Sequence, residues 1–139
     1  MSSKVSSDSW TGPPKWPEDA EIKEYAGGCH CKKFRFKFTH PIFENGGMKV
    51  TTCNCSICNQ HGLYNIYVPQ SRFELTSGSE DEMSKYQLAG KPSTHRFCPN
   101  CGSNMIVRWG DLVVVNVRAV DDIDVKGLDF FHLDGRNLF

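Results

Sequence analysis

Seven cysteines, grouped in three short clusters, are the residues of this chain with the clearest chemistry. The clusters contain Cys29 and Cys31, then Cys53, Cys55 and Cys58, then Cys98 and Cys101. Thiolates at such spacings are typical of zinc sites, in which four ligands surround the metal as a tetrahedron. Seven cysteines therefore divide into one closed site of four and one site of three, whose fourth position must be filled from elsewhere.

The first and third clusters predict a structural zinc site. The segment Phe97-Cys98-Pro99-Asn100-Cys101-Gly102 has the form of a zinc knuckle, in which the glycine lets the backbone fold back under the metal. The pair Cys29 and Cys31 directly precedes a strand and can supply the other two thiolates. Such a metal would clip the start of the domain to a point near residue 100 and offset the entropy of the long loop. His30 would then lie outside the tetrahedron.

The second cluster predicts a reactive site. Three thiolates from one short loop, Cys53, Cys55 and Cys58, can cover one face of Zn²⁺ and leave the opposite face open. The open position suits a small thiol held as its thiolate better than a water molecule, because three anionic sulfurs weaken the metal as a Lewis acid. Three alternatives remain: His61 closes the site, Cys53 merely packs as a small apolar residue, or the cluster is a metal-free redox site.

The elements that must position these cysteines are predicted to be short strands separated by turns. From Lys33 to Phe38, three phenylalanines alternate with three basic residues, which indicates a strand with one buried face and gives the charged face no function. Other strand-like runs are 48–52, 63–68, 72–75, 95–97, 105–109 and 112–120, while 80–86 fits a helical turn or a strand. We therefore expect one small, mainly antiparallel β domain.

The charge balance and hydropathy of the chain argue against nucleic-acid and membrane partners. The 16 basic and 16 acidic residues cancel, so no overall field attracts nucleic acid, and we expect no such partner. No apolar run approaches the roughly 18 residues that span a bilayer, and no secretory signal opens the chain. We expect no membrane partner, reduced thiols and a cytoplasmic location, with a nuclear one left open.

The N-terminal residues differ in composition from the rest. Residues 1–20 are rich in serine and proline and are predicted to form a flexible arm, and residues 21–139 form the domain. Trp10 and Trp16 indicate that part of the arm lies on the domain or on a second subunit, which leaves a homodimer open.

The three cysteine motifs, in this order and separation, resemble the glutathione-dependent formaldehyde-activating enzyme family, which also includes centromere protein V. The resemblance covers about residues 22 to 137, including the segments 73–78 and 115–118 followed by Asp121. It implies a β-tent fold, a structural zinc at the four-cysteine site, and a labile or catalytic zinc at the three-cysteine site. The implied activity joins glutathione reversibly to formaldehyde as S-hydroxymethylglutathione. Asn54 stands where bacterial members often carry histidine.

We therefore expect a zinc-dependent carbon-sulfur lyase that holds a small thiol, glutathione by the resemblance, beside an electrophilic carbon. Cys53, Cys55 and Cys58 would be catalytic, and His61 would shuttle the proton, ahead of Tyr64 and Tyr67. For the carboxylates of glutathione, Arg118 is preferred to Arg96, Arg108 and Lys91 because it lies in a matching motif.

Two rival interpretations treat the protein as something other than an enzyme. A zinc-stabilised binding module would use the basic strand face and the N-terminal tryptophans. A zinc or redox sensor would use the three-cysteine cluster and lose its metal reversibly on mild oxidation.

Overall fold

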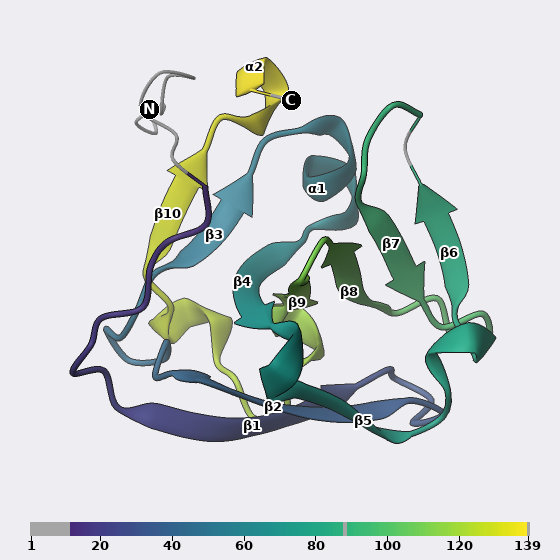
Figure 1. Cartoon of the computed structure of the whole chain (residues 1–139), viewed down its shortest axis with the longest axis horizontal. Coiled ribbons are helices and arrows are strands. Elements are labelled where there is room, and N and C mark those ends of the chain that lie inside the picture. Colours follow the sequence, from purple (N-terminus) through teal and green to yellow (C-terminus); the bar gives the residue numbers. More distant parts are fainter. Residues whose placement is uncertain (1–11, 88, 139) are drawn as a thin grey trace.

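The computed structural model describes residues 12–87 and 89–138, and its strands form two sheets (Figure 1). The smaller sheet has the order β1-β2-β5 and is antiparallel throughout. Its strands are β1 (Ile22–Gly28), β2 (Arg35–Pro41) and β5 (Phe73–Ser77). This sheet forms the base of the molecule in Figure 1, and the strands of the larger sheet stand over it.

The larger sheet has seven strands in the order β10-β3-β4-β9-β8-β7-β6. They are β3 (Val50–Cys53), β4 (Tyr64–Pro69), β6 (Ser84–Gln87), β7 (Thr94–Phe97), β8 (Asn104–Trp109), β9 (Leu112–Asn116) and β10 (Phe130–Leu133). Neighbouring strands are antiparallel except β10, which runs parallel to β3. The predicted mainly antiparallel β domain is confirmed, with one parallel pair at its edge.

The core lies between the two sheets. Phe34, Phe36 and Phe38 are almost fully buried, as their alternation predicts. The valines that alternate along β9 are buried in the same cluster, including Val113 and Val115. One face of the larger sheet is thus covered by the smaller sheet, and its other face is available to form a site.

The basic residues beside the phenylalanines are paired with carboxylates. Arg35 makes a two-pronged ion pair with Asp121, and Lys33 and Lys37 lie 3.9 and 3.8 Å from Glu82 and Glu74. These contacts compensate the positive charge of the strand face. The face therefore has the ordinary character of a solvated surface, and a binding module gains no support from it.

Two short α-helices and four 3₁₀ turns connect the strands. They are α1 (Ser56–His61), α2 (Gly135–Leu138), η1 (Gln70–Arg72), η2 (Glu80–Glu82), η3 (Val117–Ala119) and η4 (Val125–Gly127). The expected strand over 112–120 is wrong at its end, because the side chain of Asn116 accepts a hydrogen bond from the Arg118 amide (3.2 Å) and starts η3. In the described part of the chain, no helix is long and apolar enough to cross a membrane.

Trp16, in the expected arm, contacts the domain. Its ring packs edge-on against His40 with centroids 4.9 Å apart, and the Arg72 guanidinium lies 5.2 Å from its centroid. Trp10, for which a similar contact was expected, lies outside the described residues.

Candidate metal centres and active-site cavity

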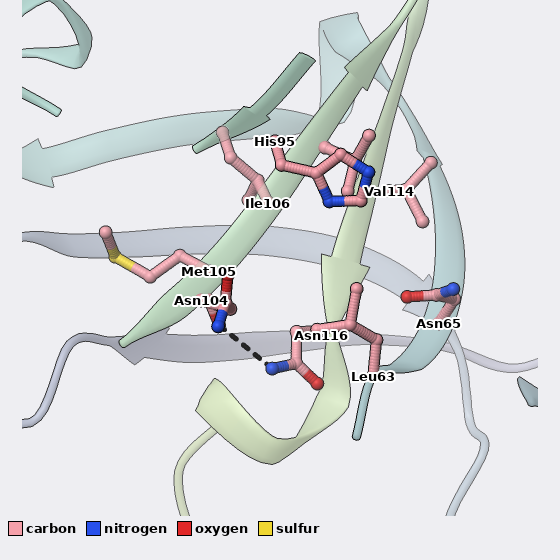
Figure 2. A pocket seen from close by; sticks show the side chains of 9 residues that line it. Leu63, Asn65, His95, Asn104, Met105, Ile106, Val114 and Asn116 are labelled. Carbon is pink, nitrogen blue, oxygen red and sulfur yellow. Dashed lines mark hydrogen bonds between the residues drawn. The ribbon is translucent and has the colours of Figure 1, made fainter. Parts of the chain in front are cut away.

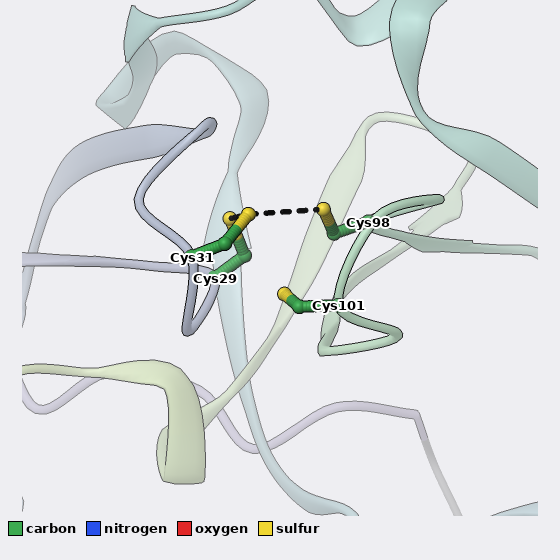
Figure 3. Close-up of side chains that lie close together, drawn as sticks. All are labelled: Cys29, Cys31, Cys98 and Cys101. Carbon is green, nitrogen blue, oxygen red and sulfur yellow. Dashed lines mark hydrogen bonds between the residues drawn. The ribbon is translucent and has the colours of Figure 1, made fainter.

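The structure brings Cys29, Cys31, Cys98 and Cys101 together, with all four sulfur atoms within 4.8 Å of one another (Figure 3). The Cys31 sulfur lies 3.7 Å from those of both Cys29 and Cys98. A zinc tetrahedron with Zn–S bonds of about 2.3 Å has S···S edges of about 3.8 Å. Two of the six S···S distances match this edge and the others lie within 4.8 Å, so the four sulfurs can supply all four ligands of a zinc ion and leave none for a substrate.

Two facing loops hold these sulfurs. The loop after β1 turns at Lys32, whose φ of 67° is left-handed, and the loop after β7 turns at Gly102, with φ of 79°. Ser103 links the loops, because its hydroxyl accepts a hydrogen bond from the His30 amide (3.0 Å) and lies 3.2 Å from the Cys101 sulfur. That hydroxyl contact is the main reason why the pKa of Cys101 falls to about 5. Sequence reasoning missed Ser103, which carries no motif of its own.

The second group, Cys53, Cys55 and Cys58, also has its sulfurs within 4.8 Å of one another. Cys53 ends β3, Cys55 is the N-cap of α1, and Cys58 lies in the first turn of that helix. Residues three apart across the first turn share one side of a helix, so the two helical thiols face the same way as the strand end.

Electrostatics show how closely these thiols interact. Hydrogen bonds with Cys53 and Cys58 lower the pKa of Cys55 to about 2, and the contacts with Cys53 and Cys55 raise the pKa of Cys58. The side-chain amide of Asn65 lies 3.8 Å from the Cys58 sulfur, as a donor to it. The cluster thus holds one negative charge readily, and its soft donor set is one that Zn²⁺ prefers.

The three-cysteine cluster opens into a cavity of about 620 Å³, whereas the four-cysteine site does not line it. The floor of the cavity is the uncovered face of the larger sheet. Strand register aligns Tyr67, Val114, Val107 and His95 in one row across β4, β9, β8 and β7, and all four line the cavity, as does Trp109. This volume lies within the range of about 300–1,000 Å³ that is typical of small-molecule sites.

A much smaller cavity of about 10 Å³ adjoins this floor, with nine residues around it (Figure 2). Asn65 and His95 line both cavities, and Asn116 lines the small one while donating to the Asn104 carbonyl (2.9 Å). Its size is at the lower limit for one water molecule, which would need two or more polar partners. The small cavity is thus bounded by polar side chains from β4, β7, β8 and β9.

A family model described as glutathione-dependent formaldehyde-activating enzyme matches residues 24–128. The chain belongs to this family. The crystal structure of a Rhodobacter sphaeroides protein has a similar fold, with a TM-score of 0.63 and 20% identity over 76% of this chain and 99% of that one. No protein with a curated description matches the chain.

In this member of the formaldehyde-activating enzyme family, two of the expected site residues lie outside the cavity. His61 is exposed at the end of α1, and it does not join the group of three sulfurs within 4.8 Å. Arg118 is exposed on η3, where its guanidinium stacks 4.3 Å from the ring centroid of Tyr64. The proximity of each to a motif in the sequence does not bring its side chain to the cavity.

Of the other cations proposed to bind glutathione, Arg96 and Arg108 form ion pairs with Glu80, whereas Lys91 lies at the cavity. Both arginines contact Glu80, with Nε–oxygen distances of 3.1 and 3.0 Å. Lys91 lines the cavity, as does Tyr67, one of the two tyrosines ranked behind His61 as candidates for proton transfer. Burial is the main reason why the pKa of Tyr67 is raised, so its hydroxyl keeps its proton at neutral pH.

His95, Trp109 and Arg136 are among the cavity residues that were not foreseen from the sequence. The alternation of β7 and β8 could have placed His95 and Trp109 on one face, but only the pairing of the strands shows that the cysteines lie over that face. Arg136 reaches the cavity because α2 follows β10, an unforeseen strand that runs beside β3.

Proposed function

We propose that this protein is a zinc-dependent carbon-sulfur lyase that forms and cleaves the adduct of a small thiol, glutathione, with formaldehyde. The observation that carries the proposal is the contrast between the two clusters. One cluster offers four sulfurs, enough to complete the zinc ligands, while the other offers three sulfurs that line a cavity of about 620 Å³. The family to which the chain belongs is named for the same two reactants.

The reaction needs no oxidant. The thiol sulfur attacks the formaldehyde carbon and a C–S bond forms. The π bond of the carbonyl breaks, and the proton of the thiol ends on the oxygen, which becomes the new hydroxyl. Zn²⁺ held by Cys53, Cys55 and Cys58 would keep an added thiol deprotonated at neutral pH. Cleavage is the same sequence reversed.

In this proposal, side chains from the floor of the cavity accept and donate the proton. His95 lies in the row beside Val107, and burial lowers its pKa, so its imidazole is neutral at pH 7 and has one nitrogen free to accept a proton. Tyr67 is three strands away in the same row, with β8 and β9 between, and its protonated hydroxyl can donate to a developing alkoxide. The apolar side chains between them, Val107 and Val114, exclude water from the reacting carbon.

The test is the exchange of formaldehyde and glutathione with S-hydroxymethylglutathione at equilibrium, followed by NMR exchange spectroscopy. We expect the zinc-loaded protein to accelerate exchange and Cys55→Ser to reduce it to the uncatalysed rate, with bound zinc falling from two ions per chain to one. Lys85→Met, a change of an exposed residue outside the cavity, should keep the full rate. Full exchange by Cys55→Ser would refute the proposal.

A further inference from the structure

Apart from the three cysteines, the charged side chains that line the large cavity are all cations. Among its described lining residues there is no aspartate or glutamate, whereas Lys91 and Arg136 supply two cations. Elsewhere the basic residues near the sheets are commonly compensated, as Arg96 and Arg108 are by Glu80. Within the described ranges, neither cavity cation forms an ion pair.

The backbone of Arg136 is fixed relative to the sulfur cluster. Its backbone amide donates to the side-chain oxygen of Asn54 (2.9 Å), and the side-chain nitrogen of Asn54 donates to the Asp134 carboxylate (2.7 Å). Asn137 donates to the other oxygen of Asp134 (2.7 Å). Because Asn54 lies between Cys53 and Cys55, α2 is tied directly to the loop that carries the sulfurs.

Lys91 lies on another side of the cavity, in the turn between β6 and β7. The side-chain amide of Gln87 donates to the Lys91 carbonyl (3.0 Å) and so closes this turn. The two cations therefore come from separate elements, α2 and the β6–β7 turn, and both line the cavity into which the three cysteines open.

We infer that Lys91 and Arg136 bind the carboxylates of an anionic thiol whose sulfur lies at Cys53, Cys55 and Cys58. This inference rests on the proposed function and deepens it, because it assigns the selection of the thiol to two residues. A cavity with cations and no carboxylates favours a peptide-like thiol with free carboxylates over a neutral thiol of the same size. Arg136 lies beyond the residues 24–128 that match the family model, so its part in this selection rests on the structure of this chain.

The test is calorimetric binding of S-methylglutathione to the zinc-loaded protein. This probe keeps both carboxylates of glutathione, but its sulfur is capped and cannot become a thiolate, so binding reports on carboxylate recognition. We expect Lys91→Met and Arg136→Met each to weaken binding about tenfold, as the loss of one charge-assisted hydrogen bond predicts. The double variant Lys49→Met with Lys85→Met removes two exposed cations outside the cavity and should bind as the wild type does.

The outcomes separate this inference from the proposed function. Unchanged binding by Lys91→Met and Arg136→Met, or a loss on Arg118→Met instead, would overturn the inference even if the protein catalyses exchange. Absence of binding by the wild type would overturn it as well. A tenfold loss specific to the two cavity cations would support it, even in a protein that showed no exchange activity with formaldehyde.

Discussion

His61 and His95 are the two histidines that could transfer the proton, and their positions differ in a way that sequence spacing does not reveal. His61 is three residues beyond Cys58 in the chain, yet it is exposed at the end of α1. His95 is distant in sequence, yet it lines the cavity from the row that includes Tyr67. A candidate acid or base must reach the reacting atoms before its pKa matters, so the geometry favours His95.

The first prediction concerns these two side chains. Because general acid–base catalysis contributes about a hundredfold or more, we expect His95→Asn to lower kcat by about that factor while KM for glutathione changes little. His61→Asn should retain most of kcat. Steady-state kinetics with both variants, each first shown to bind two zinc ions, make the measurement.

Asn54 also has a role that depends on its neighbours in space. It contacts Asp134 and the Arg136 amide, so it holds α2 beside the cluster. We expect Asn54→Ala to weaken binding of S-methylglutathione about as much as Arg136→Met does, with both zinc ions retained, because the cation is no longer positioned. The free energy of unfolding should fall by about 2–3 kcal/mol, because two hydrogen bonds are lost and one of them is to the buried Asp134 carboxylate. Unchanged binding would show that α2 holds its place without Asn54.

At the scale of secondary-structure elements, the sequence predicts the features that depend on residues close together in the chain. The alternation of Phe34, Phe36 and Phe38 predicts β2 and its buried face, and the knuckle spacing groups the cysteines correctly. The partners of each strand are set by long-range packing, which is why β1 and β10 were missed and why the site floor was not foreseen. The end of β9 was misjudged because Asn116 caps η3, a side-chain effect that competes with strand propensity.

The four-cysteine site joins elements of both sheets, and this predicts a difference in stability between the two clusters. Cys29 and Cys31 follow β1 of the smaller sheet, while Cys98 and Cys101 follow β7 of the larger one. Structural zinc contributes about 10 kcal/mol or more to small domains, and a domain is stable by only about 5–15 kcal/mol. We expect Cys98→Ser to be largely unfolded at room temperature and Cys55→Ser to remain folded.

Near-ultraviolet circular dichroism and urea unfolding of both variants measure this difference. Cys31→Ser is the matched change in the other loop of the same site and should behave like Cys98→Ser. Equal stability of Cys98→Ser and Cys55→Ser would show that the closed site does not hold the two sheets together.

At the scale of the whole molecule, the segment before β1 is joined to the smaller sheet through His40. The His40 ring is 2% exposed and lies between Trp16 and Phe43, with centroids 4.9 and 5.6 Å away. Its Nδ1 hydrogen bond with the Pro41 carbonyl (2.7 Å) fits a neutral ring that donates from Nδ1. Burial lowers the pKa of His40 to about 4, from an ordinary value of 6.5.

This shift predicts how stability depends on pH. The unfolded chain takes up a proton at His40 below about pH 6.5, while the folded chain resists protonation down to about pH 4, so the unfolded state binds more protons in that window. The contribution of the neutral His40 ring to the free energy of unfolding is therefore fully present above pH 6.5 and is lost as the pH falls toward 4. At 1.36 kcal/mol per pKa unit, the full loss over this window amounts to about 3 kcal/mol.

The measurement compares urea unfolding of the wild type and of His40→Gln between pH 7 and pH 4.5, because loss of zinc in acid affects both proteins alike and cancels in the difference. We expect the wild type to lose about 2–3 kcal/mol relative to the variant on acidification. In Trp16→Ala the His40 ring gains access to water, its pKa rises toward 6.5, and the same difference should shrink. A difference that does not change with pH would mean that His40 is protonated to the same extent in the folded and unfolded chain, and that Trp16 does not shield it.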